Sequence, residues 1–173
     1  MEPRPIDQYH TLCVIPDGGA MLALDASTTA VGWCLADNDG YVDSGCFRPK
    51  SRDVWERIDQ IHDWVEGFVR GEFDYARKHL WLVALEEPTG SHGNARTDRL
   101  LGAVLGVVRA VCHRFGVRFL LINPMQVKAT GLDKDHTAEA ALYVGKAEVD
   151  SDQADAIGLW QAAMQVLLEE TAS

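Results

Sequence analysis

Two apolar runs in the sequence each end in acidic residues, and this pattern limits the folds that the chain can adopt. The run 21–24 ends at Asp25, and the run 81–85 ends at Glu86 and Glu87. Short apolar runs bounded by small residues or proline are typical of buried strands. A carboxylate at such a strand end is costly unless a cation or hydrogen-bond donors compensate it. The alternative for a lone strand-end acid such as Asp25 is a turn or capping role, so the other acids of the chain decide between the two.

The order of the remaining patterns predicts an α/β layer fold with a mixed sheet. We expect strands at 21–27, 30–36, 41–48, 79–87 and 117–122, the last one buried. Helices are expected at 51–70, 95–115, 124–128, from Asp135 or Thr137 to Val144, and from Asp150 or Ser151 onward. The first helix has an apolar stripe that Trp55 and Trp64 widen.

The domain organisation follows from length and composition. The chain has 173 residues, of which 47% are hydrophobic, so it suits one domain with a real core. We expect an N-terminal extension at 1–20, in which 11–15 either adds an edge strand or is part of a tail, and a single domain at 21–173. No apolar run is long enough to span a bilayer, and no signal peptide is evident. The four cysteines lack metal-binding spacing, which favours free thiols in the cytoplasm.

Charge is unevenly distributed along the chain. The net charge of −10 argues mildly against nucleic acid, because contacts with phosphates supply most non-specific affinity. Its distribution matters more than its total. No Lys or Arg follows position 146, whereas basic residues flank the predicted loops: Arg48, Lys50, Arg52, Arg96, Arg99, Lys128 and Lys134. We interpret this pattern as a basic rim around an acidic centre.

The last predicted helix carries a second pair of acids. Asp152 and Asp155 are three residues apart, so they share one helical face near the N-terminus. They could be solvated acids that interact favourably with the helix dipole. However, Asp155 borders the apolar stripe of the helix, which favours a shared cation. With Asp25 and one strand-end Glu, they would supply four oxygen ligands, a set that suits Mg²⁺ or Mn²⁺ and phosphodiester hydrolysis.

Five motifs in order resemble the RuvC-type Holliday-junction resolvases of the RNase H-like superfamily, over about residues 21–165. The motifs are Leu24-Asp25-Ala26-Ser27 with Val31-Gly32-Trp33, Ser44-Gly45-Cys46-Phe47-Arg48, Val83-Ala84-Leu85-Glu86-Glu87, Gln126-Val127-Lys128 and Asp152-Gln153-Ala154-Asp155-Ala156-Ile157. The resemblance implies an RNase H-like mixed five-stranded sheet flanked by helices. The alignment of apolar and acidic positions selects Glu86 over Glu87.

The resemblance also implies an activity. Members of this family act as homodimers on four-way DNA junctions and nick two strands by hydrolysis that leaves a 3′ hydroxyl and a 5′ phosphate. Asp25, Glu86, Asp152 and Asp155 would hold two Mg²⁺ or Mn²⁺ ions. Lys128 would contact DNA near the scissile phosphate, and Lys134 would take the place of a second basic residue. We expect further DNA contacts from the rim residues Arg48, Lys50, Arg96 and Arg99.

Assembly and selectivity are less constrained by the sequence. Gly102 and Gly106 lie on one face of the predicted helix 95–115, which suits either ordinary packing or a dimer contact. The loop after Glu87 has Pro88, Thr89 and His92 where cellular members of the family have an aromatic wedge, which puts junction selectivity in doubt.

Small size and acidity suggest a phage protein in the host cytoplasm that also trims other branched DNA. The alternatives are a YqgF-like nuclease acting on RNA and a non-catalytic module that binds branched DNA. No feature identifies a partner helicase.

Overall fold

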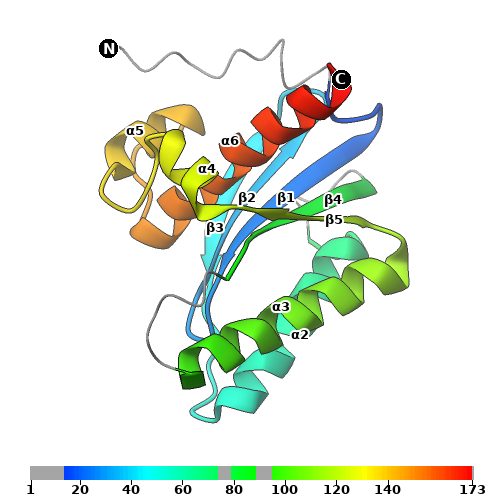
Figure 1. Ribbon diagram of the computed structural model, residues 1–173, viewed down its shortest axis with the longest axis vertical. Helices are drawn as coiled ribbons and strands as arrows, with labels where there is room; N and C mark the ends of the chain where they lie inside the picture. Colours follow the sequence, from blue (N-terminus) through cyan, green and yellow to red (C-terminus); the bar gives the residue numbers. More distant parts are fainter. Residues whose placement is uncertain (1–13, 74–78, 89–94, 173) are drawn as a thin grey trace.

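A mixed five-stranded sheet lies at the centre of the computed structural model, with helices on both faces (Figure 1), as the sequence predicted. The structure describes residues 14–73, 79–88 and 95–172. The strands are β1 (Gly19–Ala26), β2 (Val31–Asp37), β3 (Val42–Phe47), β4 (His79–Glu86) and β5 (Arg118–Ile122), in the spatial order β3-β2-β1-β4-β5. β1 is antiparallel to β2 but parallel to β4, so the central strand joins the two halves of the sheet.

The central strands are mostly apolar up to their acidic ends because both faces of the sheet are covered. Along β1, Met21 and Ala23 belong to the core on one face, while Leu22 and Leu24 belong to the core on the other. All four side chains are fully buried. This two-sided burial explains why the sequence shows a continuous apolar run here rather than an alternating one.

In the described residues, helices cover both faces of the sheet (Figure 1). α2 (Val54–Val69) and α3 (Ala95–Phe115) lie together on the first face. α4 (Pro124–Ala129), α5 (Thr137–Tyr143) and α6 (Ser151–Thr171) occupy the second. α6 crosses β1 and β2 and buries a long face that includes Ile157 and Trp160. None of the helices in the described ranges is long and apolar enough to cross a membrane.

Two helix starts differ from the sequence prediction. α2 begins at Val54 rather than Ser51, because the Asp53 side chain caps it by accepting hydrogen bonds from the first-turn backbone. Trp55 is 60% exposed and does not widen the apolar stripe, whereas Trp64 is half-buried and stacks on Phe47. The cap of α5 is His136, which makes no capping bond with its side chain. Neither Asp135 nor Thr137 caps this helix, and Asp150 caps α6 as expected.

The edges of the sheet also differ from expectation. β5 was predicted to be buried, but it is an edge strand paired only with β4, and Leu121 is 39% exposed. Of the proposed edge strand at 11–15, only Val14 and Ile15 are described, and they pack into the core outside the sheet. β1 begins at Gly19, two residues inside the predicted extension. The predicted loop residues Thr89 and His92 lie outside the described ranges.

Candidate metal site

Asp25 stands near the end of the central strand and points toward α6. It pairs with Gly32 of β2 across the antiparallel ladder. Because successive side chains alternate between faces of a strand, Asp25 shares its face with Met21 and Ala23, which belong to the core under α6. The buried strand therefore delivers its only acid to the α6 side of the sheet.

Glu86 ends the neighbouring strand on the same face. Leu24 pairs with Leu85 in the parallel β1–β4 ladder, so the next residues, Asp25 and Glu86, come side by side. Glu86 shares its face with Leu82 and Ala84, again under α6. Glu87 lies beyond the end of β4 and is exposed, and its backbone N–H donates to the Ile122 carbonyl.

The first turn of α6 rests directly on the strand opposite Asp25. A side-chain Cβ on Gly32 would lie 1.9 Å from the carbonyl oxygen of Asp152, so only glycine permits this approach. The start of α6 is fixed by a capping box in which Asp150 and Gln153 each bond to the other's backbone N–H. This packing brings Asp152 and Asp155 over the end of β1.

The carboxylates of the other three acids affect the pKa of Asp25. Burial is the largest of the effects that together raise the pKa of Asp25 to about 7, and the carboxylates of Asp155, Glu86 and Asp152 follow in that order. The pKa of Asp155 is also raised, chiefly by burial. An all-oxygen set of crowded, partly desolvated carboxylates fits a hard divalent cation such as Mg²⁺ or Mn²⁺, which would relieve this repulsion.

A cleft of about 380 Å³ opens beside Asp25 and Glu86. Its other walls include Ser27, Pro88 and, from the first turns of α3, Thr97. The cleft gives the strand-end acids access to solvent and to a bound molecule. Arg96 and Arg99 are exposed in the same first turns of α3 as Thr97, but neither lines the cleft.

The loop that carries Lys134 is tied to α6. The backbone N–H of Lys134 donates to Asp155 Oδ1 at 2.7 Å, while the side chain of Lys134 is exposed. A Cβ on Gly158 would lie 2.1 Å from the Leu132 carbonyl oxygen, so the same loop packs tightly on the helix. Lys128 is exposed in the last turn of α4.

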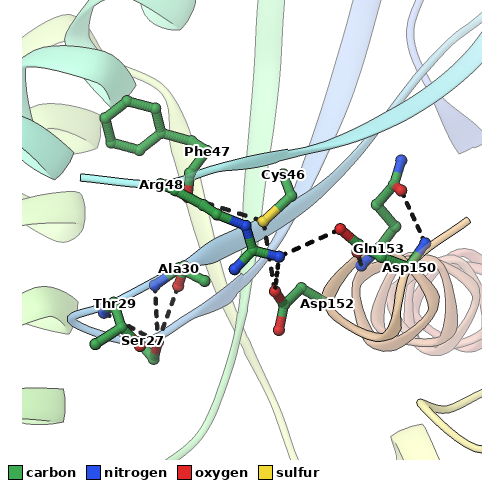
Figure 2. Close-up of polar contacts among 9 residues, drawn as sticks. All are labelled: Ser27, Thr29, Ala30, Cys46, Phe47, Arg48, Asp150, Asp152 and Gln153. Atoms are coloured by element: carbon green, nitrogen blue, oxygen red, sulfur yellow. Dashed lines mark hydrogen bonds and ion pairs between the residues drawn. The ribbon is translucent and has the colours of Figure 1, made fainter. Parts of the chain in front are cut away.

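Sequence reasoning missed a second group of ligand-type atoms beside Asp152. Cys46, Asp150 and Asp152 place one such atom each within 4.8 Å of one another (Figure 2). The Cys46 thiol donates to Asp152 Oδ2 at 3.5 Å, and Arg48 Nη2 donates to the same oxygen at 2.7 Å. The alternation of β3 could have indicated that positions 46 and 48 share a face, but their partner lies about a hundred residues away in the chain.

Of the comparisons with known proteins, the one with solved structures supports the fold. No protein-family model matches the chain, and no curated protein matches it. Among solved structures, Thermus thermophilus RuvC in complex with a Holliday junction substrate is similar, with 20% identity, 88% of this chain and 95% of that chain covered, and a TM-score of 0.69. A structure of Thermus thermophilus RuvC alone gives 19% identity, coverage of 88% and 96%, and a TM-score of 0.64.

A more distant similarity extends over most of the chain. The yeast mitochondrial Holliday junction resolvase Ydc2 is 13% identical, with 94% of this chain and 86% of that chain covered and a TM-score of 0.55. The matching regions are nearly complete in both directions, so the similarity is not limited to one motif. The chain therefore has the RNase H-like fold of RuvC-type resolvases.

Proposed function

We propose that this protein is a metal-dependent endonuclease that resolves four-way DNA junctions, with activity on other branched DNA. The proposal rests on the effect of Glu86, Asp152 and Asp155 on the half-buried Asp25, whose pKa all three raise. Such a set is poorly explained by structure alone, because burial and repulsion both disfavour the charged forms. The fold shared with junction resolvases supports the same conclusion.

The four acids would hold Mg²⁺ or Mn²⁺, two ions in each site. Bound ions of this kind activate water for in-line attack and neutralise charge on the phosphate. Asp25 is central to the cluster, since each of the other three carboxylates acts on its pKa. The backbone N–H of Lys134 orients Asp155, and the capping box fixes the start of α6, the helix that carries Asp152. These contacts hold the ligands in place before DNA arrives.

The exposed basic residues around this centre would bind the DNA backbone. Lys128 and Lys134 lie on the α6 side, and Arg96 and Arg99 are exposed at the start of α3. Arg48 and Lys50 follow the end of β3. Contacts of this kind position DNA rather than read its sequence. They also allow an acidic protein to bind DNA, because the charge that faces the phosphates is local.

Two symmetric nicks call for two active sites, so we propose that the protein acts as a homodimer. Gly102 and Gly106 are exposed on the outer face of α3, and a Cβ at either position would meet open space. This face could therefore accept a second copy at close range. We place the protein in the bacterial cytoplasm, in keeping with the free thiols of Cys34, Cys46 and Cys112.

A cleavage assay on labelled substrates tests the proposal. Four-way junction, flap, duplex DNA and structured RNA are each incubated with Mg²⁺, Mn²⁺ or EDTA. We expect paired nicks in the junction with either ion, weaker cleavage of flaps and none in EDTA. Preferential cleavage of RNA would favour the YqgF-like alternative. Junction binding without cleavage under any ion would favour a non-catalytic module.

A further inference from the structure

Arg48 lies immediately after β3 and reaches the acidic end of α6. Its Nη2 donates to Asp152 Oδ2 at 2.7 Å and lies 3.3 Å from Asp150 Oδ2 (Figure 2). Asp152 Oδ2 also accepts from the Cys46 thiol, so two donors already contact this oxygen. The guanidinium is therefore the counter-ion of a carboxylate that we have assigned to the metal site.

The same arginine lines a surface hollow of about 290 Å³. Its other lining residues are Phe47, Lys50, Gln60, Asp63 and Trp64. Within the described parts of the chain, the Lys50 ammonium makes no ion pair. The rings of Phe47 and Trp64 stack at 5.0 Å, and in Figure 2 the Phe47 ring points away from Asp152. With two cations and one acid, the hollow has the chemistry of a site for a DNA phosphate beside a nucleoside.

We propose that Arg48 alternates between these two places: it neutralises Asp152 until a divalent cation binds there, and then binds a DNA phosphate together with Lys50. The proposal rests on the function proposed above. Its consequence is that loading of the metal site and tight DNA binding are coupled through one side chain. The partner of the released guanidinium is the phosphodiester backbone of the branched DNA.

Two physical arguments support this exchange. When Asp152 coordinates a divalent cation, its negative charge is neutralised and the guanidinium is repelled, so the Arg48–Asp152 pair loses its driving force and only the longer contact with Asp150 remains. The side chain of Arg48 is 57% exposed, so its reorientation removes little buried contact. Ion pairs at this exposure are weak and easily replaced. A phosphate in the hollow offers the guanidinium a bidentate partner in exchange.

The competing explanation is a permanent brace, in which Arg48 holds the first turn of α6 in place whatever is bound. The two explanations differ in sign for metal affinity. If Arg48 competes with the ion, Arg48→Gln should tighten Mn²⁺ binding to the free protein, by about two- to fivefold for an exposed pair. If Arg48 is a brace, loss of the contact should weaken Mn²⁺ binding or leave it unchanged. Mn²⁺ titration followed by electron paramagnetic resonance measures this without DNA or cleavage.

Lys50→Gln is the matched control, since Lys50 lines the same hollow but contacts none of the four acids. Its Mn²⁺ affinity should equal that of the wild type. Equal tightening in both variants would mean that only the general field of positive charge was removed, and would overturn the proposal.

DNA binding supplies the second measurement. Junction affinity is measured against KCl concentration in EDTA and in Ca²⁺, with the substrate checked for integrity. We expect the salt slope of the wild type to steepen in Ca²⁺ by about one unit relative to Arg48→Gln, because one more phosphate is contacted. Comparing variants in the same buffer cancels the effect of Ca²⁺ on the DNA itself. Arg48→Lys should restore most of the difference, and Lys50→Gln should lower the slope by about one unit in both buffers.

The outcomes separate this proposal from the function on which it rests. If the wild type binds and cleaves junctions but its slope changes between EDTA and Ca²⁺ no more than that of Arg48→Gln, Arg48 is not released and only this inference is wrong. If the wild type neither binds nor cleaves junctions, the proposed function fails first. Tighter Mn²⁺ binding by Arg48→Gln, together with its loss of the Ca²⁺-dependent change in salt slope, would establish the exchange.

Discussion

Asp25 and Gly32 face each other across the β1–β2 ladder, and the helix that carries two of the other acids packs directly on Gly32. The missing side chain at position 32 thus sets the distance between the central strand and α6. Gly32→Ala should push the first turn of α6 away from Asp25, because the new Cβ would overlap the Asp152 carbonyl. We expect a loss of about 1–3 kcal/mol in unfolding free energy and a larger relative loss of cleavage.

The control for this substitution is Gly106→Ala, where the new Cβ meets open space on a helix. It should be neutral or slightly stabilising, because alanine favours a helix over glycine. Urea denaturation measures both variants, and junction cleavage measures Gly32→Ala. Normal cleavage in Gly32→Ala would mean that the helix start does not depend on this contact.

The raised pKa of Asp25 predicts how stability depends on pH without divalent ions. Its pKa is about 7 in the folded protein and 3.8 in an ordinary environment, so the folded state holds the proton more tightly. Folding stability should therefore fall as pH rises from about 4 to about 7 and then level off, with about 1.4 kcal/mol for each unit of difference in pKa. Asp25→Asn should flatten this fall, be close to wild type at pH 4 and be more stable at pH 7.5. Denaturation in EDTA across this range checks the prediction.

Divalent ions should act in the opposite direction on the same proteins. At pH 7.5, Mn²⁺ should raise the melting temperature of the wild type because it relieves the repulsion around Asp25. The Asp25→Asn variant should gain much less and should not cleave. An equal gain in both proteins would place the ion elsewhere.

The choice of Glu86 over Glu87 can be tested with a matched pair of substitutions. Glu86→Gln should lower cleavage by about a hundredfold or more. Mutating a residue that only hydrogen-bonds to a metal ligand already lowers metal affinity or activity by about ten- to a hundredfold. Glu87→Gln should keep most activity, because this side chain lies beyond β4 and is exposed. The reverse result would keep the site but assign its ligand to Glu87.

Lys128 offers a test of the basic rim. Lys128→Ala should reduce the salt slope of junction binding by about one unit and lower cleavage, with an unchanged melting temperature. The residue is exposed at the end of α4, so the fold should tolerate its loss. Unchanged binding and cleavage would make Lys128 a solvated helix charge.

The proposed dimer contact on the outer face of α3 can be tested with a larger side chain at Gly106. Gly106→Leu should weaken a homodimer, whereas the monomer should keep its fold because the position is open. Light scattering and sedimentation measure the oligomeric state of both proteins. A wild type that is monomeric at concentrations where it cleaves junctions would contradict the dimer.

Local patterns in the sequence predicted most of the fold. The apolar runs and the spacing of apolar residues in helices placed every strand and helix that the structure describes, with errors mainly at element ends. They failed for β5 because a run of apolar residues does not reveal how many neighbours a strand has, and Leu121 is exposed at the sheet edge. They failed for Trp55 because its size suggested burial that the capped start of α2 does not provide.

Local patterns also predict the positions of the candidate site's acids, but not the contacts that these acids make with distant residues. The strand-end positions of Asp25 and Glu86 follow from the apolar runs that precede them. The shared face of Asp152 and Asp155 follows from helix geometry. The contact of Arg48 with Asp152 joins residues far apart in the chain, so no local period contains it. The contact of Lys134 with Asp155 uses a backbone N–H, which every residue except proline has and which leaves no mark on the sequence.

Because of this last contact, the backbone and the side chain of Lys134 have separate roles. The main chain donates to the carboxylate of Asp155, and the side chain is exposed, where we propose that it contacts DNA. Almost any residue at this position would keep the acid oriented, so the affinity for the nucleic acid backbone can change there without disturbing the chemistry. Proline alone would remove both functions at once. Tuning of substrate preference and preservation of the reaction centre are thereby uncoupled at a single position.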